Sequence, residues 1–146
     1  HELSGKPTFT RGTQIKGGTL EQGLDLDDVE KKVRSGVDFF LTNSIFDPTL
    51  FKAFTEKISH FKVPIIAGIT LLKSVGMARY ISKHVEGTSI PEAIIDRLMK
   101  ASDKQRTSVE IAGELVKAIR PFCQGIHLIP IGWENQIPVL LDHAGL

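Results

Sequence analysis

Hydrogen-bonding side chains follow directly after a run of large apolar residues in the stretch FFLTNSIFD, which begins at Phe39. The first three residues are typical of a buried strand, whereas Thr42 and Asn43 carry a hydroxyl and a carboxamide. A carboxamide both donates and accepts hydrogen bonds, so Asn43 is interpreted either as a ligand-binding residue or as the cap of a turn. Asp47 stands before Pro48 and is interpreted as the N-cap of a helix, because its carboxylate can accept from free backbone N–H groups.

Two further apolar runs carry side chains that could meet a ligand. Gly68 lies in VPIIAGIT, where it permits the close approach of a flat ligand or only the close packing of a helix. Trp133 and Glu134 follow GIHLIPI: an indole could form one wall of a ring site and a carboxylate could accept a hydrogen bond, although glutamate also favours a first helical turn. His127 lies inside that run, where a lone histidine is more often a hydrogen-bonded core residue than a proton donor.

Other kinds of chemistry find little support in the sequence. The spacing of His, Asp and Glu residues predicts no metal site, and no Ser-His-Asp or Cys-His arrangement can be defended, so no catalytic residue is assigned. Cys123 is the only cysteine and is interpreted as a small buried apolar residue. A chain without an intrachain disulfide suits a reducing compartment, and we expect the cytoplasm.

Composition limits the architecture and the partners. The chain has 146 residues, of which 41% are hydrophobic and 24% charged, so we expect a single domain over residues 1–146 with one core. Its 18 Lys and Arg against 17 Asp and Glu predict no general surface for nucleic acid or acidic membrane. The longest apolar runs are strand-sized and the beginning HELSGKPT lacks a signal-peptide pattern, so we expect neither a membrane span nor export.

Short apolar runs alternate with longer stretches of helical periodicity, and this alternation predicts an α/β fold. Strands are expected at residues 8–15, 37–43, 63–70 and 125–131. Helices are expected at residues 24–36, 47–61, 73–85, 90–101, 104–122 and 133–146. Near-continuous apolar strands separated by helices favour a parallel sheet, because each crossover must return the chain to the same end.

Ligands of α/β folds bind at the carboxyl ends of the strands. This rule selects the segments 14–18, 42–47, 68–73 and 130–134. None of these turns carries the GxGxxG or GxxxxGK[ST] pattern of a phosphate-binding loop. A (β/α)8 barrel needs ~250 residues, so four such strands correspond to about half of one.

The ordered series LDLDDVEKKVRSGVDFFLTNSIFD, VPIIAGIT, RYISKHVEGTSIPEAIIDRL and GIHLIPIGWE resembles the C-terminal half of the methylenetetrahydrofolate reductase family. The ending is similar to the branch found in acetogen-like one-carbon metabolism. The resemblance implies strands five to eight of a flavin-containing (β/α)8 TIM barrel that reduces 5,10-methylenetetrahydrofolate to 5-methyltetrahydrofolate. The N-terminal half, which supplies the general-acid carboxylate of the family, is not in this sequence.

The resemblance also implies a cofactor site for FAD or FMN. Asp28, Lys31 and Lys32 match family positions near the ribose and phosphates of the flavin, and lysine is a suitable point charge for a phosphate. The alternative interpretation is that these residues form the solvated face of an amphipathic helix.

The folate site is implied by other positions. Thr42 and Asn43 match the TQ pair that contacts the pterin, although asparagine is one methylene shorter than glutamine. Tyr80 is the nearest match to an aromatic residue that lines the aryl portion of folate, whereas a helical tyrosine is more often ordinary packing. We expect Gly68, Trp133 and Glu134 to complete the substrate site.

These observations leave several functions open. The chain is expected to reduce methylenetetrahydrofolate with flavin or to supply the folate- and flavin-binding half of such an oxidoreductase. The alternatives are a non-catalytic folate-binding or assembly module and a pterin-dependent methyltransferase-type barrel. Because a half barrel exposes sheet edges and an apolar face, we expect a homo-oligomer or a complex with the missing barrel half.

Overall fold

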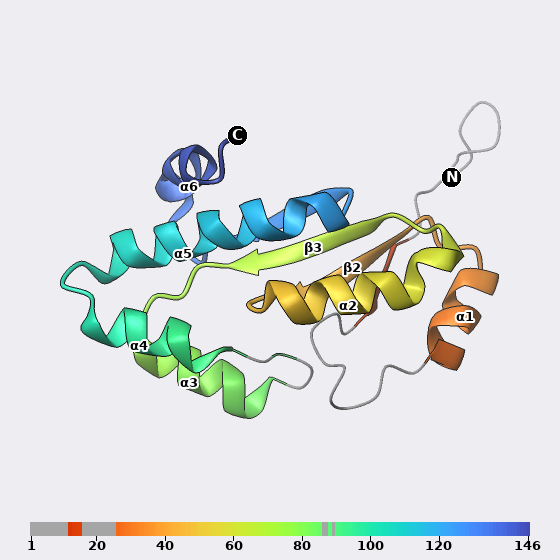
Figure 1. Cartoon of the computed structure of the whole chain (residues 1–146), viewed down its shortest axis with the longest axis horizontal. Coiled ribbons are helices and arrows are strands. Elements are labelled where there is room, and N and C mark those ends of the chain that lie inside the picture. Colours follow the sequence, from red (N-terminus) through yellow and green to blue (C-terminus); the bar gives the residue numbers. More distant parts are fainter. Residues whose placement is uncertain (1–11, 16–25, 86–87, 89) are drawn as a thin grey trace, which may run out of the picture.

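The computed structural model of the chain describes residues 12–15, 26–85, 88 and 90–146 (Figure 1). The strands are β1 (Gly12–Ile15), β2 (Phe39–Ser44), β3 (Ile65–Thr70) and β4 (Gly125–Ile129). The helices are α1 (Leu26–Arg34), α2 (Pro48–Ile58), α3 (Val75–His84), α4 (Glu92–Lys100), α5 (Lys104–Ile119) and α6 (Ile137–His143). Three short 3₁₀ turns are η1 (Ser59–Phe61), η2 (Arg120–Phe122) and η3 (Glu134–Gln136). This order of elements confirms the predicted α/β class; the expected strand residues 8–11 lie outside the described residues.

The four strands form one parallel sheet in the order β1-β2-β3-β4, so each strand pairs with its neighbour in sequence. Parallel crossovers are right-handed in nearly all proteins. Crossovers that always step in the same direction therefore carry their helices to one face of the sheet. The opposite face receives no helix from the described parts of these connections.

The burial of the strands follows this asymmetry. Phe40, Ala67 and Ile69 point to the helices and are at most 1% exposed. They belong to a core that includes Phe51 and Phe54 of α2, whose ring centres lie 6.3 Å apart. Nearly complete burial of these side chains supplies the main apolar stabilisation of the helical layer.

The other face of the sheet is more open. Leu41 and Ile66 pair across β2 and β3 and are only half-buried, and neither belongs to the core cluster. His127 of β4 pairs with Gly68 and is exposed. The expectation of a buried His127 is wrong because its side chain lies on the face that the described helices leave open.

Local signals explain where α2 begins. Asp47 accepts hydrogen bonds from the backbone N–H groups of Thr49 at 2.9 Å and Leu50 at 3.3 Å, and Pro48 occupies the first turn. These contacts satisfy N–H groups that have no partner within the helix. The N-cap interpretation of Asp47 is confirmed, and Asp47 is a structural residue.

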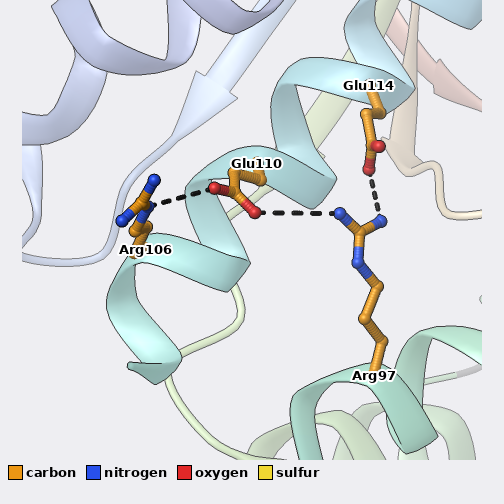
Figure 2. Close-up of polar contacts among 4 residues, drawn as sticks. All are labelled: Arg97, Arg106, Glu110 and Glu114. Carbon is orange, nitrogen blue, oxygen red and sulfur yellow. Dashed lines mark hydrogen bonds and ion pairs between the residues drawn. The ribbon is translucent and has the colours of Figure 1, made fainter. Parts of the chain in front are cut away.

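The crossover from β3 to β4 contains α3, α4 and α5. Arg97 of α4 pairs with Glu114 of α5 and lies 3.9 Å from Glu110, which itself pairs with Arg106 at 3.2 Å (Figure 2). These side chains are largely solvent-exposed, so their ion pairs contribute little to stability individually. They link the outer surfaces of α4 and α5.

The last helix packs closely on α5. A Cβ atom on Gly113 would lie 2.5 Å from His143 Cβ and 3.1 Å from the backbone oxygen of Leu140. Only glycine allows α6 to approach α5 at this distance. None of the described helices is both long and apolar enough to cross a membrane.

Candidate functional site

The carboxyl end of β2 is irregular at the residues that sequence analysis selected. The pairing register between β2 and β3 shifts between Leu41 and Ser44, which makes Thr42 and Asn43 a bulge. Bulges redirect side chains and occur frequently beside active sites. The polar turn of the FFLTNSIFD stretch is therefore a distortion of the sheet edge where ligands bind in parallel α/β folds.

The hydroxyl of Thr42 stabilises this bulge. Thr42 is 4% exposed, and its Oγ1 accepts from the backbone N–H of Gly68 at 3.1 Å. The same hydroxyl donates to the backbone oxygen of Asn43 at 2.7 Å. The side chain thus replaces a missing ladder hydrogen bond and fixes the backbone of Asn43.

Asn43 connects the sheet edge to the long crossover. Its Nδ2 donates to Oγ1 of Thr88 at 2.9 Å, and Thr88 is 6% exposed in the connection between α3 and α4. The side chain of Asn43 is half-buried. Its carboxamide is therefore held in one orientation by Thr88, a partner far away in sequence. The sequence analysis did not identify Thr88.

Gly68 faces the bulge from β3. A Cβ atom at this position would lie 3.2 Å from the backbone oxygen of Thr42 and 3.3 Å from that of Asn43. Backbone oxygens cannot rotate away, so a side chain here would require β2 to move by a few tenths of an ångström. The close approach of the strands therefore favours glycine at this position, and its predicted contact with a flat ligand stays a prediction.

Two hydroxyl groups extend the polar edge. Ser44 and Thr70 pair through their side-chain oxygens, and Thr70 is 7% exposed. Each is the last residue of its strand and lies in a segment, 42–47 or 68–73, that the sequence selected, although neither was named as a site residue. Together with Thr42 and Asn43 they give the β2–β3 edge a continuous row of hydrogen-bonding groups.

The turn after β4 brings Trp133 and Glu134 to the same edge of the sheet. Trp133 is half-buried and packs against the core. The exposed Glu134 accepts from the backbone N–H of Gly132 through Oε1 at 3.2 Å. Lys73, the last residue of one segment selected from sequence, places its Nζ 5.5 Å from the centre of the Trp133 ring.

Tyr80 lies apart from this group. It is 62% exposed on α3, and its ring contacts that of His84 at a centre-to-centre distance of 4.6 Å. Among the described contacts, no hydrogen bond or ring contact joins Tyr80 to the polar edge. Its assignment to the aryl portion of folate stays a prediction.

The described part of the chain shows no metal centre, and its one resolved pKa shift belongs to Cys123. No group of three His, Cys, Asp or Glu side chains in these segments could hold a metal ion. Burial raises the pKa of the Cys123 thiol, against a smaller lowering by a hydrogen bond from the backbone of Gly125. Cys123 is half-buried rather than buried, and it precedes β4 at the amino end of the sheet.

Comparison with known proteins assigns the family. The profile of the methylenetetrahydrofolate reductase family matches residues 18–145, which is most of the chain. The chain belongs to the methylenetetrahydrofolate reductase family. The name of this family describes enzymes that reduce methylenetetrahydrofolate.

One curated relative of this family is methylenetetrahydrofolate reductase 2 of Schizosaccharomyces pombe. It is 24% identical over 136 aligned residues, which cover 84% of this chain. The chain spans only 21% of the length of that relative. The comparison therefore concerns one segment of a much longer reductase.

The residues that the family resemblance assigned to flavin lie elsewhere on the molecule. Lys31 is exposed and Lys32 is half-buried in the last turn of α1; the side chain of Asp28 lies outside the described part. Figure 1 draws α1 beside the tail of the β3 arrow, away from its head. The structure does not bring these lysines together with Thr42 and Asn43.

Proposed function

We propose that this chain contributes strands five to eight of a flavin-dependent methylenetetrahydrofolate reductase barrel. The observation that carries the proposal is the bulge at Thr42 and Asn43, which holds a carboxamide at the carboxyl edge of a parallel sheet. Family membership supplies the substrate class, folate, and the reaction class, reduction. The proposed product is 5-methyltetrahydrofolate.

The barrel interpretation is supported by topology. Strands that follow one another in both sequence and space, with crossovers on one side, are the arrangement of a (β/α)8 barrel. In such a barrel the half-buried Leu41 and Ile66 would face inward, where opposite strands complete the packing. We propose that residues 1–146 act as one domain and that the remaining half, in a longer chain or in a second subunit of a cytoplasmic complex, closes it.

The proposed pterin contact is the carboxamide of Asn43. A pterin presents adjacent donors and acceptors on its ring, and a carboxamide can match such a pair. Thr42 would act indirectly, because its hydroxyl fixes the backbone of Asn43. Trp133 and Glu134 would form the boundary of the site on the β4 side. For Tyr80 to contact the aryl portion of folate, that portion would have to extend over α3.

The chain fits a flavin in two separated places. The exposed ammonium of Lys31 is a suitable partner for a phosphate, and the polar edge near Asn43 is suitable for rings that lie against the pterin. The separation between α1 and this edge favours the extended FAD over FMN, whose phosphate is close to its ring. Reduced flavin would supply the hydride for the reaction.

The contribution of this chain to the mechanism is orientation and exclusion of water. Asn43 would hold the pterin in one plane, because its amide is itself oriented by Thr88. The apolar residues on the open face would exclude water once the barrel closes. Positioning of two reactants in this way supplies a large part of the rate enhancement of many enzymes.

Three measurements test the proposal together. The purified protein should carry the visible absorbance of flavin, bind tetrahydrofolate, and form a dimer or a complex in solution. A colourless monomer that binds folate would instead indicate a non-catalytic folate-binding module. A flavin-free protein that transfers a methyl group from a pterin would indicate the methyltransferase alternative.

Variants of Asn43 test the pterin contact. Asn43→Ala should weaken tetrahydrofolate binding roughly tenfold or more, because a donor and an acceptor are both lost. Asn43→Gln introduces the residue of the related reductases and should retain much of the affinity. Thr88→Val is the matched control for the supporting hydrogen bond and should weaken tetrahydrofolate binding less than Asn43→Ala. If all variants bind tetrahydrofolate as tightly as the wild type, Asn43 is not a ligand residue.

A further inference from the structure

A lysine is held against a tryptophan where the turns after β3 and β4 meet. The Nζ of Lys73 lies 5.5 Å from the centre of the Trp133 ring, a cation–π distance. The backbone N–H of Leu71 donates to the oxygen of Ile129 at 3.1 Å, so the sheet fixes both turns. The ammonium group therefore has a defined position at the carboxyl edge.

The turn after β4 is shaped to leave room for this ammonium. A Cβ atom on Gly132 would lie 2.9 Å from Nζ of Lys73, and Gly132 has a φ of 88°. The preceding residue, Ile131, has a φ of 47°, which is unfavourable for a β-branched side chain. Such backbone strain persists where surrounding structure requires it and is common at ligand sites.

The ammonium has no carboxylate partner among the described residues. The carboxylate of Glu134, two residues beyond Gly132, accepts instead from the backbone N–H of Gly132 at 3.2 Å. The described ion pairs involve Glu30, Glu110 and Glu114, and none involves Lys73. Lys73 is half-buried, so part of its hydration is already lost before any ligand binds.

We propose that Lys73 binds an anionic group, a carboxylate or a phosphate, of the ligand at the carboxyl edge, with Trp133 and Gly132 holding its ammonium in place. The position matches the edge that carries Asn43, and a charge-assisted contact is stronger than a neutral one. The identity of the ligand rests on the proposed function. The carboxylates of a folate tail are one source of such an anion. The phosphates of a flavin are the other, and they would then bind Lys73 in place of the proposed Lys31 contact.

The competing interpretation is that Lys73 only joins two turns through the indole ring. That role needs neither an anion nor a particular ligand. It predicts that removal of the charge lowers the melting temperature and affects every ligand alike. An anion site predicts a loss restricted to ligands that carry the anion.

The first experiment uses the fluorescence of Trp133, the only tryptophan of the chain. The purified full-length protein is titrated with glutarate and with inorganic phosphate. The fluorescence should change saturably in the wild type and in the control Lys100→Met, an exposed lysine of α4. In Lys73→Met, which keeps the aliphatic stem, anion affinity should fall roughly tenfold or more, and Lys73→Arg should restore it. Equal anion affinity in the wild type and Lys73→Met would overturn the proposal.

The second experiment identifies the source of the anion. If the folate tail binds Lys73, then Lys73→Met weakens tetrahydrofolate and leaves a tetrahydropterin without the tail unchanged. If a flavin phosphate binds Lys73, then the variant weakens FAD or FMN and leaves riboflavin unchanged. Unchanged affinity for both pairs of ligands overturns the proposal while the proposed function stands. If the wild type binds none of these ligands, the proposed function fails and the anion titration alone decides the role of Lys73.

Discussion

The two faces of the sheet carry similar apolar residues, but the described helices pack on only one of them. Phe40 and Phe39 are adjacent residues of the same type; Phe40 faces the helices and is 0% exposed, whereas Phe39 is half-buried on the other face. The same contrast separates Ala67, at 0% exposure, from its half-buried neighbour Ile66. Strands that are apolar on both faces are typical of sheets that are covered on both sides.

This difference agrees with the proposal that a second barrel half covers the open face. The helical face is an ordinary core, in which Phe51 and Phe54 belong to the same cluster of buried residues as Phe40. The open face has apolar side chains of the same kind without a described layer above them. The site at the carboxyl edge lies on the rim of that open face, so closure of the face and completion of the site are expected to depend on the same event.

The largest predicted effect compares the two faces directly. In the 146-residue chain, Phe40→Ala should lower the free energy of unfolding by about 3–5 kcal/mol, because a buried ring is replaced by a cavity. Phe39→Ala is the matched control on the open face and should cost only about 1 kcal/mol. Equilibrium unfolding in denaturant, followed by far-ultraviolet circular dichroism, measures both.

The same pair of variants tests the proposed closure of the open face. When the chain is part of the longer protein or of its complex, the open face should be buried. The cost of Phe39→Ala should then approach that of Phe40→Ala. A cost that stays near its value in the 146-residue chain would contradict closure of this face.

The second prediction concerns the close contact in the helical layer. Gly113→Ala should destabilise the protein by about 1–3 kcal/mol, because the new methyl group would overlap His143 and move α6. Gly76→Ala is the control in α3, where the nearest atom to a new Cβ is Ser74 Oγ at 3.8 Å. This control should raise the free energy of unfolding by about 0.4–1 kcal/mol, because alanine lowers the conformational entropy of the unfolded chain. The melting temperature should fall in Gly113→Ala and rise in Gly76→Ala. An unchanged melting temperature in Gly113→Ala would contradict the close contact between α5 and α6.

Sequence reasoning found the elements because local signals determine them. Asp47 and Pro48 begin α2, and Gly36, the last residue of the helix expected at 24–36, has a φ of 88° and follows the end of α1 at Arg34. The bulge at Thr42 and Asn43 coincides with the polar turn that the sequence selected. The helix ends depend on local chemistry and can be predicted without tertiary information, whereas the bulge itself was not predicted because it depends on the pairing of β2 with β3.

The remaining features of the site depend on contacts between distant segments. Thr88, in the connection between α3 and α4, supports Asn43, and Lys73, in the turn after β3, contacts Trp133 in the turn after β4. Periodicity indicates neither contact, because each depends on how the crossover returns to the sheet. His127 illustrates the converse error: its apolar surroundings in sequence suggested a core, but the described fold leaves its face open.

The third prediction concerns the outer surface of the covered side. Glu114→Gln removes the carboxylate that pairs with Arg97 and should cost about 0.2–1 kcal/mol at low salt. The cost should nearly vanish in concentrated NaCl, because salt screens exposed charges. Glu56→Gln is the control, an exposed residue of α2 that has no ion pair among the described contacts. A salt-independent loss would contradict a purely surface role for the Arg97 network.

The smallest predicted effect concerns the thiol at the end of the covered face. Cys123 lines a cavity of about 310 Å³ bordered by Val116 and Leu141, and burial raises its pKa. Since the thiolate is the reactive form, iodoacetamide should alkylate the folded protein more slowly than the unfolded chain at the same pH. The pKa of this thiol is higher in the folded protein than in the unfolded chain, where it is about 8.5. The resulting contribution to the free energy of unfolding is fully present below the unfolded-state pKa and is lost as pH rises through the folded-state pKa. The free energy of unfolding should therefore fall more steeply with rising alkaline pH in the wild type than in Cys123→Ala. An equal pH dependence in both proteins, together with equal alkylation rates of the folded and unfolded chain, would place this thiol in solvent.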